Sequence, residues 1–102
     1  MAEIGKARET LLTRILEGDG RAPRDERRAA FDGAELPEPV GTLLRKVAQR
    51  SNAVTDDDVA AVRASGLSED QIFELVVCAA VGQANRQYEA ALAALDAAAG
   101  ER

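Results

Sequence analysis

The chain has 102 residues, enough for one small domain, and its formal net charge is −5 at pH 7. It contains no histidine and a single cysteine, Cys78, which excludes Ser-His and Cys-His nucleophile pairs, internal disulfides, paired-cysteine redox motifs and cysteine-based zinc sites. No apolar run approaches the roughly 20 residues of a membrane span, and we expect no cofactor and no bound metal.

The first 20 residues predict an amphipathic helix over residues 2–17. Gly18, Asp19 and Gly20 follow the last apolar position and end this helix. The charged residues spread through the segment differ from the basic start and apolar core of a signal peptide, so we expect a cytoplasmic protein. The apolar residues that recur at helical spacing are Ile4, Ala7, Leu11, Leu12 and Ile15.

Two further helices are predicted over residues 23–31 and 37–50. Pro23 is tolerated in a first helical turn, and Gly33 is an end signal for the first of these helices. Residues 51–54 break the pattern after the second helix. The apolar positions of that second helix are Val40, Leu43, Leu44 and Val47.

Basic residues are concentrated in the first half of the chain. Residues 1–51 carry ten Lys or Arg and nine Asp or Glu, whereas residues 52–102 carry three and nine. The local basic cluster consists of Arg21, Arg24, Arg27 and Arg28. Because two acidic residues interrupt this cluster and no aromatic ring lies next to it for stacking on bases, we predict a solvated helix with internal ion pairs. Nucleic acid is therefore not an expected partner.

Two helix-start signals follow in close succession. Thr55 and the three aspartates after it predict an N-cap and an acidic first turn for a helix over residues 56–64, and Gly66 ends that helix. Ser68 and Gln71 form a capping box, so the next helix begins at residue 69.

The last helix is predicted over residues 69–98, and its centre is apolar on nearly every side. Between residues 72 and 84 the only polar side chains are Glu74 and Gln83, so we expect this central helix to be surrounded by protein. Gly82 leaves open whether the helix bends, because a glycine inside a helix costs about 1 kcal/mol relative to alanine.

These elements predict an all-α fold: one domain over residues 1–102, built as a small bundle of four to five helices with a long apolar C-terminal helix. Alanine occurs 21 times, ten of them between residues 79 and 99. A helix faced with alanine buries little area per residue, so we expect another subunit to complete its packing. The expected partner is a second copy or another protein, and no membrane.

Residues 54–92 read VTDDDVAAVRASGLSEDQIFELVVCAAVGQANRQYEAAL. This segment resembles the C-terminal part of the carboxymuconolactone decarboxylase and alkylhydroperoxidase-D-like superfamily. Members often have a short helix capped by Thr-Asp, an Ala-x-Gly-Leu-Ser turn and a long apolar helix with an Asn-Arg pair, here Asn85 and Arg86. The resemblance covers about two fifths of the chain and implies a helix pair joined by a fixed turn.

The chain departs from that superfamily at the redox site. Redox-active members carry a CxxC pair with nearby His and Glu residues on an upstream helix that has no counterpart here, so the resemblance carries over no catalytic residue. Cys78 lies in the last helix between Val77 and Ala79, where we expect a buried, inert thiol with a raised pKa. A reactive or intersubunit thiol is the alternative.

Three polar residues of the last helix are the remaining candidate site residues: Glu74, Arg86 and Tyr88. In a low-dielectric interior, Glu74 would have a raised pKa and act as an acid or base, while Arg86 would hold a carboxylate. The alternative is structural. Glu74 would then pair with an arginine, and Arg86 and Tyr88 would fix a helix contact or a subunit interface.

Two classes of function follow from these observations. The preferred class is a non-catalytic helical assembly or accessory protein that self-associates or packs on a partner enzyme. The alternative is a cofactor-free enzyme similar to the carboxymuconolactone decarboxylases, acting on a small organic acid with Glu74 and Arg86 in one pocket. A thiol peroxidase working through Cys78 alone is a third hypothesis.

Overall fold

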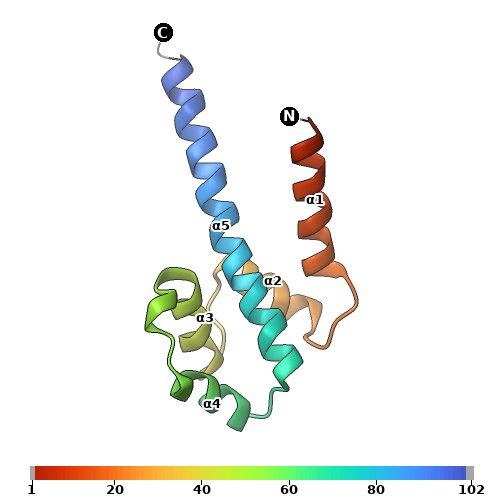
Figure 1. Ribbon diagram of the computed structural model, residues 1–102, viewed down its shortest axis with the longest axis vertical. Helices are drawn as coiled ribbons and strands as arrows, with labels where there is room; N and C mark the ends of the chain where they lie inside the picture. Colours follow the sequence, from red (N-terminus) through yellow and green to blue (C-terminus); the bar gives the residue numbers. More distant parts are fainter. Residues whose placement is uncertain (1, 101–102) are drawn as a thin grey trace.

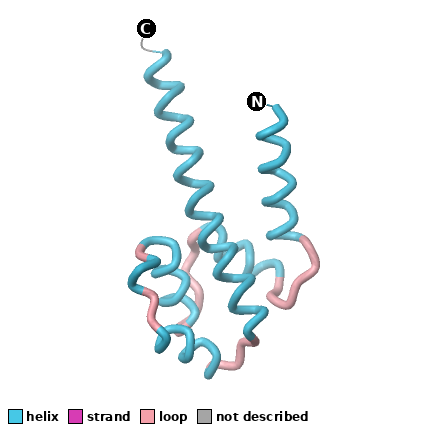
Figure 2. Tube along the Cα trace, in the orientation of Figure 1, coloured by secondary structure: helices cyan, strands magenta, loops and turns pink. Residues whose placement is uncertain are grey.

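The computed structural model describes the backbone of residues 2–100 and the side chains of residues 5–100. Within this range the chain is all-helical and has no strand (Figure 2). The predicted all-α fold is confirmed, and the predicted helices lie within a few residues of the observed ones. The elements are α1 (Ala2–Glu17), α2 (Arg24–Asp32), α3 (Val40–Gln49), the 3-10 turn η1 (Ser51–Ala53), α4 (Asp56–Ala64) and α5 (Glu69–Gly100).

Helix α3 is shorter than expected at its start. It begins at Val40 rather than at residue 37, because Pro39 occupies the N-cap and two prolines precede the helix. A residue that precedes a proline is disfavoured in the helical region, so Leu36 and Glu38 are kept out of the helix. The helix ends at Gln49, and the short turn η1 fills the break in periodicity.

The predicted caps are confirmed in detail. The Thr55 hydroxyl accepts a hydrogen bond from the Asp58 backbone, and the Asp58 carboxylate accepts one from the Thr55 backbone, which closes a capping box at the start of α4. Ser68 and Gln71 make the same reciprocal pair at the start of α5. Gly33 ends α2 with a φ of 73°, a left-handed conformation that glycine adopts without steric cost.

The core lies between the first half of α5 and the helices α2, α3 and α4 (Figure 1). Leu43, Val62 and Cys78 are the largest fully buried side chains and come from α3, α4 and α5 respectively. The other buried apolar residues are Leu16, Ala22, Ala30, Phe31, Leu44, Ile72, Leu75 and Ala79. The core is small because four short helices cover one side of one long helix.

Gly82 marks the point where α2 crosses α5. It is buried, and a Cβ at this position would overlap the backbone carbonyl of Phe31. The absence of a side chain therefore lets the end of α2 approach the α5 backbone closely. Helix α5 continues through Gly82 without a break, so this glycine serves helix packing.

The rest of this chain does not enclose the centre of α5, so the expectation that the helix is surrounded by protein is not met within one chain. Its buried residues lie on one face, whereas Phe73 is 69% exposed and Ala80 and Ala84 are exposed. The helix is also not apolar throughout, because Arg86, Glu89 and Asp96 interrupt its second half. The physical reason is that the rest of the chain is too short to enclose a helix of 32 residues.

The second half of α5 extends beyond the core. Every residue from 87 to 100 is exposed, and we call this segment the arm. Helix α1 extends from the same end of the core and lies beside the arm, so that both termini are at this end (Figure 1).

Candidate functional site

Glu74 holds the loop between α1 and α2 against α5. Its Oε1 atom accepts hydrogen bonds from the backbone N–H groups of Arg21 and Ala22, each at 2.9 Å, and Oε2 is also 2.9 Å from the Arg21 nitrogen. A carboxylate that accepts backbone N–H groups in this way is stabilised in its charged form. The side chain is therefore engaged within the chain.

Among the described side chains, Arg27 is the one charged group that is buried, with only 5% of its surface exposed. Its Nε atom donates to the Ala22 carbonyl at 3.0 Å, and Nη1 donates to the carbonyls of Gly18 at 2.8 Å and Ile15 at 3.2 Å. The last carbonyls of a helix lack partners within the helix and carry partial negative charge. Arg27 supplies those partners at the end of α1.

The prediction that the basic cluster is entirely solvated is therefore wrong for Arg27. Arg21, Arg24 and Arg28 are exposed, as expected. Helical spacing places Arg27 on the same face of α2 as Ala30 and Phe31, which are buried against α5. The sequence contained this signal, but a charged residue on an apolar face does not identify its partners, which here are carbonyls of α1 and of the loop that follows it.

The pKa of Glu74 is lowered, contrary to the raised value expected for an interior acid. Partial burial by itself raises the pKa, but the N–H groups of Arg21 and Ala22 and the charges of Arg27 and Arg21 together outweigh burial. Glu74 is consequently a carboxylate at neutral pH. It is not a proton donor held ready for general acid catalysis.

Cys78 completes this group of buried polar side chains. Its Sγ lies 3.7 Å from the Ile15 carbonyl, to which it donates a weak hydrogen bond, and only 1% of the residue is exposed. Burial raises the pKa of the Cys78 thiol, with the Arg27 charge opposing this effect and the Glu74 charge adding to it. The predicted burial of Cys78 is confirmed, and a covered sulfur with a raised pKa is expected to be a poor nucleophile.

Arg86 binds the end of α2. Its Nη1 donates to the Phe31 carbonyl, and its Nη2 donates to Gln83 Oε1 at 2.9 Å. The guanidinium also lines a cavity of about 360 Å³ between α2, α3 and α5. Other residues around this cavity include Asp32, Gly33, Glu35, Leu44, Arg45 and Gln83.

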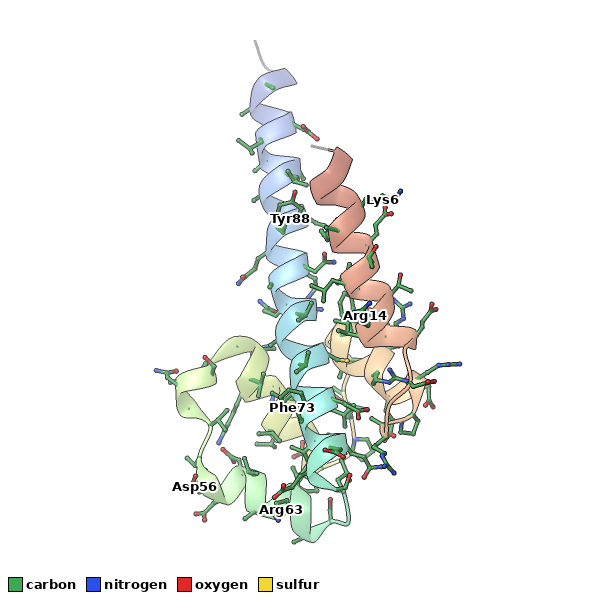
Figure 3. The ribbon with its side chains drawn as sticks, turned by 45° about the vertical axis from the view of Figure 1, so that its right-hand side comes forward. Lys6, Arg14, Asp56, Arg63, Phe73 and Tyr88 are labelled. Atoms are coloured by element: carbon green, nitrogen blue, oxygen red, sulfur yellow. The ribbon has the colours of Figure 1, made fainter. Side chains whose placement is uncertain are left out.

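Tyr88 belongs to a contact between α1 and α5. The Arg8 guanidinium lies over its ring, 5.0 Å from the centroid, in the geometry of a cation–π interaction. Arg8 Nε also donates to Asn85 Oδ1 at 2.9 Å, and Arg8 forms an ion pair with Glu89 at 3.0 Å. Tyr88 is 42% exposed on the outside of α5 (Figure 3). The tyrosine and the Asn85–Arg86 pair thus make helix contacts.

The three candidate residues do not converge on one point. Glu74 and Arg86 are twelve residues apart on α5, about 18 Å along the helix axis, and each is bound to a different segment of backbone. Tyr88 lies outside the cavity that Arg86 lines. The acid or base and the anion holder of the enzyme hypothesis are therefore not brought together.

An exposed apolar patch is the feature that sequence reasoning missed. Phe73 borders a hollow of about 300 Å³ whose apolar walls are Val59, Ile72 and Val76, with an ion pair of 3.0 Å between Arg63 and Glu69 at its edge. Figure 3 shows Phe73 on the open side of α5. The angular position of Phe73 on the helix could have indicated its exposure. On a helical wheel residue 73 lies opposite residue 75, which is buried in the core.

No family model, curated protein or solved structure matches this chain. The resemblance to the carboxymuconolactone decarboxylase superfamily therefore stays a prediction. Among residues 2–100, no helix has the length and apolarity needed to cross a bilayer. Among the side chains of residues 5–100, no three His, Cys, Asp or Glu are grouped as metal ligands would be.

Proposed function

We propose that this chain is a non-catalytic helical assembly protein that self-associates through α5. The observation that carries the proposal is the exposure of the arm, in which Leu92 is 41% and Leu95 is 66% exposed. Leucines on an otherwise uncovered helix are typical of a surface that another helix covers. A partner protein, such as an enzyme on which this chain packs, is the alternative occupant of the same surface.

The shape of the single chain supports this proposal. Its radius of gyration is 15.7 Å and its principal extents are 55 × 29 × 19 Å. A compact domain of this length has a radius of gyration of about 13 Å. The excess length lies in α1 and the arm (Figure 1), which together leave a large area for burial between chains.

The energetics of an isolated helix point the same way. Helices shorter than about 12 to 15 residues are marginal in water, and most helical stability in proteins comes from packing of one face. Alanine gives the arm a high helix propensity, but its polar contacts to α1 come only from Arg8 among the described residues. Packing against a second chain would supply the missing support.

The proposal is tested by light scattering after size-exclusion chromatography, over a protein concentration range of about a hundredfold. We expect the mass to rise above the 10.8 kDa of one chain as the concentration increases. A mass that stays at one chain over the whole range, with the chain folded by circular dichroism, would contradict self-association. Native mass spectrometry of the chain purified from its own host would then show whether a different protein covers α5.

A further inference from the structure

The side of α5 that faces away from the core has a heptad pattern. Starting from Phe73, residues on this side recur at alternating intervals of four and three, which is the spacing of a coiled-coil contact line. We call this line the outer seam. It consists of Phe73, Val77, Ala80, Ala84, Gln87, Ala91, Ala94 and Ala98.

The outer seam is uncovered in the single chain. Phe73 is 69% exposed, Val77 is half-buried, and the other six members are exposed. The core-facing side of the same helix carries Leu75 and Gly82, which are buried. Among the described residues, no other helix of the chain therefore packs along the whole outer seam.

The positions that flank the seam are uncharged from residue 76 to residue 98. The charged residues of this stretch are Arg86, Glu89 and Asp96, and all three lie towards the core side of the helix or beside α1. The flanking residues are Val76, Val81, Gln83, Tyr88, Ala90, Leu95 and Ala97. Over this stretch a docked helix would thus meet no charge that it had to desolvate, and Glu74 is the charged flanking residue at the Phe73 end of the seam.

The large apolar side chains of the seam, Phe73 and Val77, lie at one end, and only alanines lie at the other, so that apolar size falls from one end to the other. This gradient fits a copy of the same seam that runs in the opposite direction. Large residues of each chain then face small residues of the other, which fills space without overpacking. The helix dipoles also oppose one another in this arrangement.

We propose that the outer seam binds the outer seam of a second copy in an antiparallel, two-fold symmetric pair. This inference rests on the proposed function, self-association, and specifies its surface. The register that matches large with small places Phe73 opposite Ala98 of the partner subunit and Ala80 opposite Ala91 of the partner subunit. Each arm then lies on the exposed first half of the partner's α5, and the interface is isologous.

A parallel pair fits less well. It would stack Phe73 on Phe73 of the partner subunit and leave the alanine end loosely packed. It would also bring Glu69 close to Glu74 of the partner subunit, and like charges at these flanking positions are destabilising. The antiparallel register creates no such contact, because Glu74 faces Leu95 of the partner subunit.

The size of the seam is sufficient for a reversible dimer. From Phe73 to Ala98 it is about 38 Å long, and half the surface of a rod about 10 Å across and of this length is about 600 Å² per chain. Two chains would bury about 1,200 Å², the lower end of the range for stable interfaces. Gln87 lies near the two-fold axis, where a single polar residue in an apolar contact line fixes the register.

Disulfide trapping tests the register directly. Ala80→Cys and Ala91→Cys are exposed positions that the fold tolerates, and Cys78 is buried. The two variants are mixed under mild oxidation and the covalent dimer is measured on non-reducing gels. We expect cross-linking in the mixture and little in either variant alone, because only the mixed pair brings the two sulfurs within bonding distance.

Matched controls separate the possible results. Ala93→Cys lies on the other side of the arm, and its mixture with Ala80→Cys should not cross-link. Phe73→Ala should weaken dimerisation about tenfold or more while the chain stays folded, because its side chain is mostly exposed in the single chain.

The outcomes distinguish this inference from the proposed function. Strong cross-linking of each variant with itself would show a parallel pair and overturn the inference. A dimer in light scattering without cross-linking of the mixture would show that self-association uses another surface, and would also overturn it. A chain that is monomeric at all concentrations would overturn both proposals.

Discussion

Arg27 connects three segments of the chain through one guanidinium. Its donors reach the carbonyls of Ile15, Gly18 and Ala22, and its charge lies near Glu74 and Cys78. Burial of an ion is costly unless its hydrogen bonds are made, and in this case they are. Through these hydrogen bonds Arg27 joins α2 to the end of α1 and to the loop between them.

Removing this guanidinium should destabilise the fold. We expect Arg27→Met to lower the free energy of unfolding by about 3 kcal/mol, because one buried and two partly buried carbonyls lose their donor and Glu74 loses a neighbouring charge. Urea unfolding followed by circular dichroism measures the change. Arg28→Met, at an exposed neighbouring position, is the control and should change stability by less than about 0.5 kcal/mol. Equal effects of the two substitutions would contradict the assigned role.

Glu74 gives the fold a defined acid sensitivity. Since folding lowers the pKa of Glu74 from its ordinary value of 4.5, its contribution is present above that pH and is lost as the pH falls through the lower folded value. We expect Glu74→Gln to be less stable than the parent at pH 7, and the difference should shrink towards pH 3. Unfolding titrations at several pH values measure it, with Glu35→Gln as an exposed control. A difference in stability that is independent of pH would contradict the stabilising role assigned to the ionised Glu74 carboxylate.

Some of these residue roles were visible in the sequence and others were not. The caps at Thr55 and Ser68 were predictable because they depend on neighbours three residues away. The burial of Cys78 followed from the apolar residues around it. The partners of Glu74 and Arg27 lie up to 53 residues away or in another helix, and helical periodicity in one segment carries no information about such contacts.

At the scale of elements, the crossing of α2 and α5 decides the packing. Gly82 allows the Phe31 carbonyl to approach the α5 backbone, and Arg86 donates to the same carbonyl one turn further along. Helix bounds were predictable from caps and glycines, except at α3, where the prolines before Val40 delay the start. The close approach of α2 to α5 at Gly82 was not predictable, because a glycine within a helical segment is equally consistent with a bend in the helix.

Adding one methyl group at Gly82 tests how closely α2 approaches α5. We expect Gly82→Ala to destabilise the protein by about 1 to 3 kcal/mol, since overlap with the Phe31 carbonyl outweighs the gain of about 1 kcal/mol in helix propensity. Gly5→Ala is the matched control, because nothing lies within 4 Å of a Cβ at that position of α1. That control should be neutral or slightly stabilising. Thermal unfolding of both variants decides the question, and a stabilised Gly82→Ala would contradict the close approach.

At the scale of the whole molecule, the helices fall into a packed part and a projecting part. The packed part contains α2, α3, α4, the first half of α5 and the end of α1, where Leu16 is buried. The projecting part contains the start of α1 and the arm (Figure 1). Sequence reasoning predicted that another subunit completes the packing of α5, and this stays a prediction. Within one chain only one face of the centre of α5 is covered, and apolar composition alone does not tell which face the other helices cover.

Stability of the whole molecule should depend on concentration. If two chains pair through α5, mass action favours the folded dimer, so Tm should rise by several degrees between about 5 and 500 µM. Differential scanning calorimetry across this range gives the measurement. Phe73→Ala should reduce the dependence, whereas Leu11→Ala, on the exposed side of α1, should leave it intact. A constant Tm for the parent chain would argue that folding is complete within one chain.

The arm also determines how proteases would act on this protein. Between Arg86 and Arg102 there is no lysine or arginine, so trypsin has no site within the arm, whereas elastase, which cleaves after small residues, finds many alanines. In a lone chain we expect elastase to shorten α5 from its end within minutes while the core survives. At concentrations where the chains pair, the same bonds should resist digestion, and mass spectrometry of the fragments would locate the protected stretch residue by residue.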